Sequence, residues 1–331
     1  MTQTVRPATP EDIPRLVELL MLDAGARHAA DPILWRMAAD APAQIEKALN
    51  FALTAEQQPF HQIWQVSQDQ GRITGVIHAM LLPVPPIYAG ALGEPGLILP
   101  DSFVLPDAPS GTVEGLLAAA EDALHAAGAR IKLASHVTGE DWRRAFEAAG
   151  YDPLTLYLSR TDLGDQGMPA GVRFATQDDI PGIVARSAEN RQVLFGIDPF
   201  WDIHPQADAR FSAWMTRSLT LRDRDMMVLG SPDQLEGYVI AQPASRLHFP
   251  PGHDITGTGV IDDYFHHDLA SPATLDHGTE GAGALLHAAE AALAGRGIGV
   301  AFVVCPARWT SKIALLDAAG YETAMVWSIK R

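Results

Sequence analysis

The sequence predicts a mixed α/β protein in which one unit, a mostly antiparallel central sheet flanked by helices, occurs twice in tandem. Three observations support this prediction. The chain has 331 residues, more than one compact domain usually holds. It repeats its own segments in the same order, 162 to 170 positions apart. In each half the strand patterns outnumber the helical crossovers, which favours a mixed sheet over a doubly wound parallel one.

The repeat is clearest where each half begins. Residues 5–14 read VRPATPEDIP and residues 172–181 read VRFATQDDIP. Both carry a capping-box pattern, from Thr9 and from Thr176, and both continue with apolar residues at helical spacing. Each half is therefore expected to open with a short strand and a capped amphipathic helix.

The later elements repeat in the same order. The segments GRITGVI (71–77) and DQLEGYV (233–239) both indicate a hairpin turn that enters an apolar strand. A helix followed by a strand recurs at 118–135 and 287–304, and a helix that ends in AAGY precedes the last strand of each half. The segment LGDQGMPA separates the copies. We therefore expect domains at 1–162 and 171–331 with a linker at 163–170.

Composition excludes several classes of protein. The net charge of −16 argues against a nucleic-acid partner. The single cysteine, Cys305, allows no intrachain disulfide, and the acidic, proline-containing N-terminus predicts no secretory leader, which together favour the cytoplasm. The most apolar region, 76–106, is interrupted by prolines and predicts no membrane span.

This order of strands, helices and turns resembles the GNAT acetyltransferase superfamily over nearly the whole chain, twice, in a tandem arrangement similar to that of mycothiol-synthase-like proteins. The resemblance implies acetyl-CoA or another short acyl-CoA as co-substrate, no metal, and chemistry in the C-terminal half. The family holds the pyrophosphate on a helix-start turn of pattern V-x-P, then x-x-[RQ]-x-x-G-x-[GA]. Unpaired helix-start amides attract anions, and glycine lets the backbone approach them.

Only the second copy of this turn keeps its glycines. The first copy matches at Val104 and Pro106 but then has Pro109, Thr112 and Glu114 at the phosphate positions, so we expect it not to bind CoA. The second copy reads GTEGAG, although Gly278 replaces the Arg or Gln and about seven residues are inserted before it. The inserted loop is expected to cover the site or to shape the acceptor pocket. The resemblance places acyl-CoA at Phe265, His266, His267, Gly278, Thr279, Glu280, Gly281, Ala282, Gly283 and Ser311.

The strand VIDDYFHHD (260–268) carries the candidate catalytic groups. By resemblance the general base projects from this strand, and Asp263 matches its position, with Asp262 and His266 as alternatives. Period two places Asp263 and Phe265 on one face and Asp262 on the other. If the strand continues through both histidines, the same alternation predicts that His266 and His267 cannot readily share a metal ion, so a site that also draws on Asp268, Asp276 and His277 is not expected.

Other features keep two readings. The family's proton-donating tyrosine is replaced by Leu316 and, in the first half, by Phe146, which leaves the general acid open. Ser311 either contacts CoA or caps a helix. The aromatic residues Phe200, Trp201 and Trp214 either wall an acceptor pocket or pack between the domains. Cys305 is expected in the core.

The sequence therefore predicts an acetyl-CoA-dependent N-acetyltransferase that acts by direct attack of an amine in a ternary complex. The strand after 260–268 is expected to splay from it and to leave amides near 265–267 free for the thioester. The acceptor is a small-molecule or peptide amine, and the chain is a monomer with an internal pseudo-dimer or a homodimer. The alternative is a non-catalytic acyl-CoA-binding or scaffold protein with the same fold.

Overall fold

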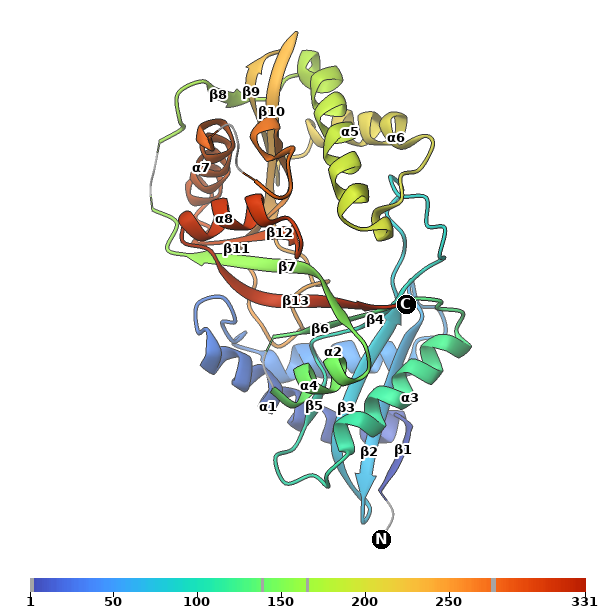
Figure 1. Ribbon diagram of the computed structural model, residues 1–331. Helices are drawn as coiled ribbons and strands as arrows, with labels where there is room; N and C mark the ends of the chain where they lie inside the picture. The colour runs from blue at the N-terminus through green and yellow to red at the C-terminus, as the bar shows by residue number, and fades with distance from the viewer. Residues whose placement is uncertain (1–2, 138–139, 165–166, 275–277) are drawn as a thin grey trace.

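The computed structural model describes residues 3–137, 140–164, 167–274 and 278–331. Its strands form one continuous sheet that runs through both halves of the chain. The strand order is β1-β2-β3-β4-β6-β13-β7-β12-β11-β10-β9-β8, with β5 beside β3. Figure 1 shows the N-terminal half below and the C-terminal half above, joined where β7 and β13 cross the middle of the molecule.

The N-terminal half contains seven strands and four α-helices among the described residues. In chain order they are β1 (Thr4–Pro7), η1 (Pro10–Asp12), α1 (Ile13–Ala30), α2 (Ala41–Thr54), β2 (Gln62–Asp69), β3 (Arg72–Leu81), β4 (Gly96–Ile98), β5 (Phe103–Val104), α3 (Thr112–Ala126), β6 (Lys132–His136), α4 (Glu140–Ala148) and β7 (Asp152–Thr161).

The C-terminal half repeats this order. Its elements are β8 (Val172–Phe174), η2 (Gln177–Asp179), α5 (Ile180–Ile197), η3 (Pro199–Trp201), α6 (Ala207–Ser218), β9 (Asp225–Ser231), β10 (Gln234–Pro243), β11 (Thr258–His266), η4 (His267–Leu269), α7 (Glu280–Gly295), β12 (Val300–Pro306), α8 (Thr310–Ala318) and β13 (Glu322–Lys330). Within the described chain only β4–β6 and β11–β12 pair in parallel, which confirms the prediction of a mixed, mostly antiparallel sheet.

Both predicted capping boxes form. The backbone N–H of Thr9 donates to the Asp12 carboxylate at 2.8 Å, and that of Thr176 donates to Asp179 at 2.8 Å. An arginine of the preceding strand pairs with each carboxylate, which is one reason why the pKa of Asp179 is lowered to about 2. Local hydrogen bonds therefore fix the same helix entry twice.

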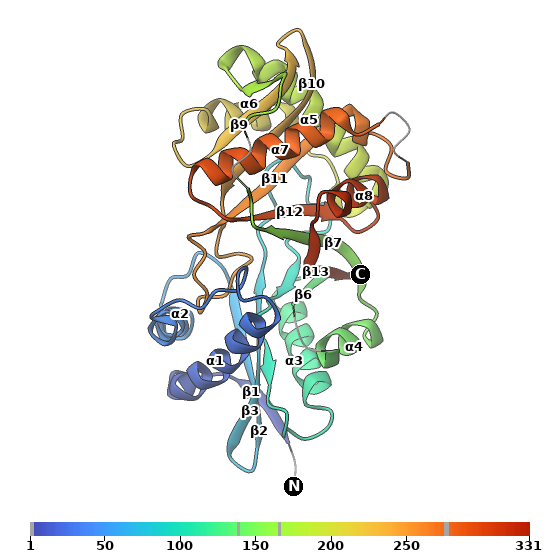
Figure 2. The ribbon, with the colours of Figure 1, turned by 90° about the vertical axis from the view of Figure 1, so that its left-hand side faces the viewer.

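Helices cover both faces of the sheet in each half. Figure 2 shows α1 and α2 on one face of the lower strands, with α3 and α4 on the other. In the upper half α5 and α6 lie opposite α7 and α8 (Figure 1). None of the described helices combines the length and the apolar character that a membrane span requires.

The two halves exchange their last strands. β7 ends the N-terminal half, yet it pairs with β12 along Thr155–Thr161, and β13 ends the C-terminal half but pairs with β6 along Lys132–His136. β7 and β13 also pair with each other. A shared core that includes Trp35, Phe249 and Phe302 packs at this junction. The sheet of each half is therefore complete only when the other half is present.

Candidate functional site

The site begins where β11 and β12 separate. The two strands pair from Thr258–Ile261 to Val300–Val303, and β11 then continues to His266 without further pairing to β12. The expected divergence of these strands is therefore present. The opening lies beside Asp262 and Asp263, so the strand's two adjacent carboxylates stand where backbone pairing stops.

A β-bulge lies at these carboxylates. In the pairing of β10 with β11, Val239 faces Tyr264 while Ala241 faces Ile261, so β11 holds one extra residue between these pairs. A bulge interrupts the strict alternation of side chains. The period-two argument therefore does not by itself assign faces here: Asp262 is exposed and lines the cavity, whereas Asp263 is partly buried and bonds to Tyr238 and Asn190.

Asp263 is held by two polar side chains. Its Oδ1 accepts a hydrogen bond from the Tyr238 hydroxyl at 2.5 Å and a longer one from the Asn190 amide at 3.4 Å. Burial raises the pKa of Asp263 to about 6, and the neighbouring charge of Asp262 adds to this, while the Tyr238 hydrogen bond, Lys312 and Arg191 oppose it. A carboxylate with a pKa near 6 is well matched to accept a proton at neutral pH.

Asp262 and Lys312 line the same cavity. Asp262 is open to the cavity, and the protein around it raises its pKa through loss of solvation. The Lys312 ammonium is buried, donates to the Tyr264 carbonyl oxygen at 3.0 Å and lies over the Tyr264 and Trp309 rings. Burial lowers the pKa of Lys312, while both aspartates favour its charged form. Asp262 and Lys312 form the charged floor of the cavity, and Asp263 lies next to Asp262 without lining it.

The cavity above this floor has a volume of about 760 Å³ and lies between the two halves. Its walls are mainly apolar, with aromatic rings from Tyr88, Tyr157, Phe200, Trp201 and Trp327. Phe200 and Trp201 line this cavity and also pack in the apolar cluster shared by the two halves, so both readings hold for them, whereas Trp214 is exposed and does not line the cavity. The volume suits a small organic ligand.

The predicted phosphate turn lies at the start of α7. Thr279 is the helix N-cap, Glu280 begins the helix, and Gly278 has a φ of +84°, which favours glycine. A Cβ on Gly283 would meet no atom within 4 Å, so this side of the turn is open. The Ala282 N–H, however, donates to the Asp268 carboxylate at 3.2 Å, so the protein's own anion occupies one of the amides expected to hold phosphate.

His266 faces α7 rather than the cavity. A Cβ on Gly281 would lie 2.3 Å from the His266 ring, which explains the need for glycine there. The His266 Nδ1 is 3.0 Å from Asp268, and burial lowers the pKa of the imidazole. His266 is therefore not beside Asp262 and Asp263, and its position gives no support to a catalytic role.

The geometric argument against a shared histidine site required the strand to continue through both residues, and the strand does not do so. β11 ends at His266 and His267 begins η4, so strand alternation does not apply, and the two imidazole rings lie 4.1 Å apart. Glu236 joins them to bring three potential ligand atoms within 4.8 Å of one another. Two of the three residues are exposed to solvent. Asp276 and His277, the other residues weighed for a metal, lie outside the described residues.

The inserted loop packs on the start of α8. The Trp309 indole N–H donates to the Leu269 carbonyl at 3.1 Å, and the Ser311 hydroxyl donates to the Ser271 carbonyl at 2.7 Å. Trp309 is the N-cap of α8, so the capping role considered for Ser311 is wrong. Phe265 is fully buried, with Trp309 at 6.3 Å between ring centroids. Residues 269–271 of the inserted loop are thus fixed to the start of α8, and the Ser311 hydroxyl that was expected to contact CoA is engaged by the protein.

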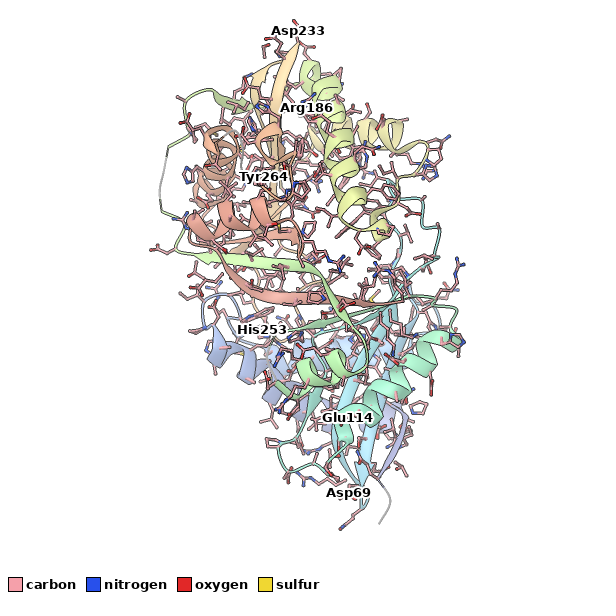
Figure 3. The ribbon with its side chains drawn as sticks, viewed as in Figure 1. Asp69, Glu114, Arg186, Asp233, His253 and Tyr264 are labelled. Carbon is pink, nitrogen blue, oxygen red and sulfur yellow. The ribbon has the colours of Figure 1, made fainter. Side chains whose placement is uncertain are left out.

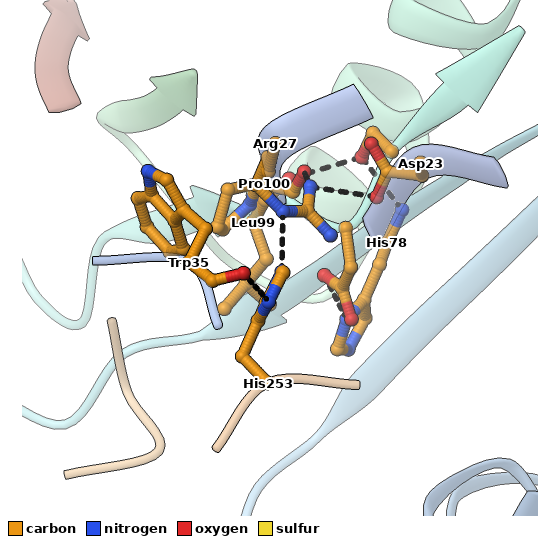
Figure 4. A network of polar contacts seen from close by, with 9 residues as sticks. Asp23, Arg27, Trp35, His78, Leu99, Pro100 and His253 are labelled. Atoms are coloured by element: carbon orange, nitrogen blue, oxygen red, sulfur yellow. Dashed lines mark hydrogen bonds and ion pairs between the residues drawn. The ribbon is translucent and has the colours of Figure 1, made fainter. Parts of the chain in front are cut away.

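The equivalent position in the N-terminal half is closed by internal contacts. Asp101, which matches Asp263 at an offset of 162, pairs with His78 at 2.9 Å. Arg27 donates to the Pro100 carbonyl at 2.7 Å and to His253 at 3.0 Å, and also pairs with Asp23 (Figure 4). Burial outweighs the arginine and raises the pKa of Asp23 to about 7. The described residues of this half, 3–137 and 140–162, form no counterpart of the open, charged cavity floor.

The first-half turn is likewise satisfied by protein groups. Thr112, at a phosphate position, is buried and donates its hydroxyl to the Pro109 carbonyl at 2.5 Å, while Gln3 donates to the Thr112 oxygen at 2.7 Å. Glu114 is exposed on the first turn of α3, as Figure 3 shows. Protein groups therefore occupy this turn at Thr112, and the absence of CoA binding there stays a prediction.

Sequence reasoning missed Lys312, Tyr238 and Asn190. Helical spacing places Lys312 with the buried Leu315 and Leu316, so a lysine on the inward side of α8 was a usable signal. Nothing local marks Tyr238 or Asn190, because they meet Asp263 only through the packing of β10 and α5 on β11. Cys305 is buried, as expected, and burial raises the pKa of its thiol to about 12.

Comparison with known proteins gives matches in structure alone. No protein-family model and no curated protein sequence matches the chain. A GCN5-related N-acetyltransferase from Sphaerobacter thermophilus matches with a TM-score of 0.56 and 16% identity, covering 99% of this chain and 95% of that one. A tandem GNAT protein from the clavulanic acid biosynthesis pathway, in a structure without acetyl-CoA, matches with a TM-score of 0.52 and 16% identity over 99% and 98%.

A third solved structure is the GCN5-related glucosamine N-acetyltransferase region of a fungal multi-domain β-N-acetylglucosaminidase. It matches with a TM-score of 0.53 and 15% identity, and covers 99% of this chain but 38% of that one. Likeness at such identity concerns the arrangement of the backbone. The chain has the fold of the GNAT superfamily, in its tandem two-domain form.

Proposed function

We propose that the protein is an acyl-CoA-dependent N-acyltransferase whose C-terminal half acylates an amine bound in the interdomain cavity. One observation carries this proposal. Asp262 lines the floor of a cavity of about 760 Å³ where β11 and β12 diverge, and the adjacent Asp263, which bonds to the cavity-lining Asn190, has its pKa raised to about 6. A base at the meeting point of a cavity and a strand opening is what direct acyl transfer to an amine requires.

The acceptor would enter as an ammonium ion. Asp262 attracts the cation to the floor, and Asp263 accepts one proton from it. The neutral nitrogen then attacks the thioester carbonyl carbon, the new C–N bond forms and the C–S bond breaks. The nitrogen releases its second proton to solvent, the thiolate takes one from Lys312, and Asp263 and Lys312 regain their starting states by proton exchange with solvent. Tyr238 holds the Asp263 carboxylate in place through its 2.5 Å hydrogen bond.

Lys312 supplies the proton donor that the missing tyrosine left open. Its ammonium is buried beside the divergence of β11 and β12, where a departing thiolate would develop charge. The lowered pKa of Lys312 makes it a better acid than a solvent-exposed lysine, and its charge stabilises a thiolate electrostatically. Both carboxylates keep it charged before the reaction.

The residues at the start of α7 fit a CoA pyrophosphate in part. The open space at Gly283 and the positive φ of Gly278 suit a phosphate-binding turn. Asp268 would have to release the Ala282 N–H for phosphate to reach that amide. This contact is the specific observation in favour of the second candidate, a protein that keeps the fold without the chemistry.

A paired substitution tests the cofactor assignment. Gly283→Glu places a carboxylate in the open space at the α7 start, and Gly295→Glu makes the same change at the other end of the helix, where a Cβ also meets nothing. Isothermal titration with acetyl-CoA should show at least a tenfold loss of affinity for the first variant and none for the second. Equal affinities would place CoA elsewhere.

Turnover separates the two candidate functions. Release of free thiol from acetyl-CoA in the presence of a panel of primary amines is the expected result for the acyltransferase. Acetyl-CoA binding without thiol release on any amine would favour the non-catalytic protein. Lys312→Met should lower kcat by roughly a hundredfold while acetyl-CoA still binds, as expected for loss of an acid catalyst.

A further inference from the structure

Two loops at equivalent positions of the repeat cross between the halves. Residues 82–95 follow β3, and residues 244–257 follow β10 at an offset of 162. Loop 82–95 leaves the N-terminal half and reaches α5 and α6, as the teal trace at the right of Figure 1 shows. Loop 244–257 crosses in the opposite direction, and Figure 3 places its His253 beside the N-terminal half. Each loop therefore crosses to the other half, but the two loops pack differently where they arrive.

Loop 244–257 fills the N-terminal half. His253 is fully buried, accepts from Arg27 Nε at 3.0 Å and donates from Nδ1 to the Trp35 carbonyl at 3.0 Å (Figure 4). Phe249 is fully buried against Trp35, with ring centroids 5.0 Å apart. Burial and the nearby arginine charge lower the pKa of His253 to about 4, so the ring is neutral and complements Arg27 as an acceptor.

Loop 82–95 instead leaves a space and forms its wall. It is fastened to the C-terminal half by backbone bonds, from Ala89 N–H to the Asp202 carbonyl at 2.8 Å and from His204 N–H to the Ile87 carbonyl at 3.0 Å. The Asp202 carboxylate also accepts from the N–H groups of Gly90 and Ala91. These contacts hold Leu82, Val84 and Leu92 against the cavity rather than in it.

The cavity is lined mainly by aliphatic and aromatic side chains from both halves, with Asp262 and Lys312 at its floor. Two other charged residues line it, and both have protein partners: Asp202 accepts from the N–H groups of Gly90 and Ala91, and Arg331 pairs with Asp198. Among the described residues, His248 adds a ring whose Nδ1 has no hydrogen-bond partner, and burial lowers the pKa of this imidazole to about 4. Apolar walls favour a ligand with a large apolar surface, at about 25 cal/mol for each Å² buried. A long polar chain would lose hydration there without replacement contacts.

We propose that the acceptor is a compact primary amine with a bulky apolar or aromatic body, and that loop 82–95 of the N-terminal half selects it. The role of this amine as an acyl acceptor rests on the proposed function. Binding of the amine in the cavity does not depend on it. The ammonium sits at Asp262 and the apolar body lies against the wall that includes Leu92. The N-terminal half thereby acts in acceptor recognition rather than in CoA binding.

Amine binding is tested without any acyl-CoA. Titration calorimetry of the full chain with 2-naphthylmethylamine, spermidine and triglycine should give an affinity at least tenfold higher for the naphthyl amine. Leu92→Arg should weaken that binding about tenfold, because it adds a cation and a polar group to the wall. Leu22→Arg is the matched control, because Leu22 on α1 does not line the cavity. The two leucines are exposed to a similar degree, 52% for Leu22 and 39% for Leu92.

Each outcome bears on one claim. Equal or tighter binding of spermidine or triglycine overturns the apolar acceptor, and tight triglycine binding would point to a peptide N-terminus instead. Equal affinities of the Leu92 and Leu22 variants overturn the role of loop 82–95. Naphthyl amine binding without acetyl transfer would sink the acyltransferase and leave this inference standing. Acetylation of spermidine by a protein that does not bind the naphthyl amine would support the acyltransferase and overturn the apolar acceptor.

Discussion

The raised pKa of Asp263 suits it to accept a proton and also makes its charged form destabilise the folded protein. Its folded pKa of about 6 lies above the ordinary value of 3.8, because burial disfavours the charged form. The free energy of unfolding therefore decreases as pH rises through 6, since the ionised carboxylate is accommodated less well in the folded protein than in the unfolded chain. The same strain on the charged form is what makes it ready to accept a proton.

Asp263→Asn should separate these two effects. The amide oxygen still accepts from Tyr238, so we expect the fold to be kept and the variant to be about 1–2 kcal/mol more stable at pH 8, with no gain at pH 3.5 where both side chains are neutral. Urea unfolding at the two pH values measures this. kcat/KM should fall roughly a hundredfold and lose its rise with pH near 6. An unchanged pH–rate profile would exclude Asp263 as the base.

At the scale of elements, Asp268 of the inserted loop occupies a backbone N–H group at the start of α7. Asp268 caps the helix at Ala282, holds His266 at 3.0 Å and thereby places a negative charge where pyrophosphate would bind. Anions at a helix start compete for the same amides and the same dipole. CoA binding is therefore expected to work against this loop as well as with the turn.

Asp268→Asn tests that competition. Asparagine keeps an oxygen that accepts from Ala282 but removes the charge, so acetyl-CoA should bind several-fold more tightly, with the gain largest at low ionic strength. Calorimetric titration at two salt concentrations measures the effect. Asp178→Asn, on the exposed first turn of η2, is the matched control and should change nothing. A loss of affinity in Asp268→Asn would show that the carboxylate supports the site.

The elements also show what a sequence can and cannot reveal. The repeat, both capping boxes and the glycine turn depend on neighbouring residues, so pattern and spacing were enough to predict them. The bulge at Asp262–Asp263, the Asp268 cap and the filling of the first half by His253 depend on contacts between distant segments. His266 was misplaced for the same reason, because the strand ends there and its ring turns to Gly281.

At the scale of the whole molecule, the repeat is not two separable domains. β7 lies between β12 and β13, so the sheet of the C-terminal half is completed by a strand that ends the N-terminal half. The reciprocal loops add contacts in both directions. The predicted linker at 163–170, of which residues 165 and 166 lie outside the described residues, joins parts that are already interleaved.

Cutting the chain at this linker tests the interleaving. A fragment of residues 171–331 would expose the β12 edge that β7 covers, along with the apolar cavity wall, so it should be insoluble or unfold without a cooperative transition. Co-expression with residues 1–170 should restore a soluble complex that unfolds in one transition, as the intact chain does. Thermal unfolding followed by circular dichroism and gel filtration measures both. Two halves that fold alone and remain apart would show that the exchanged strands are not needed for either.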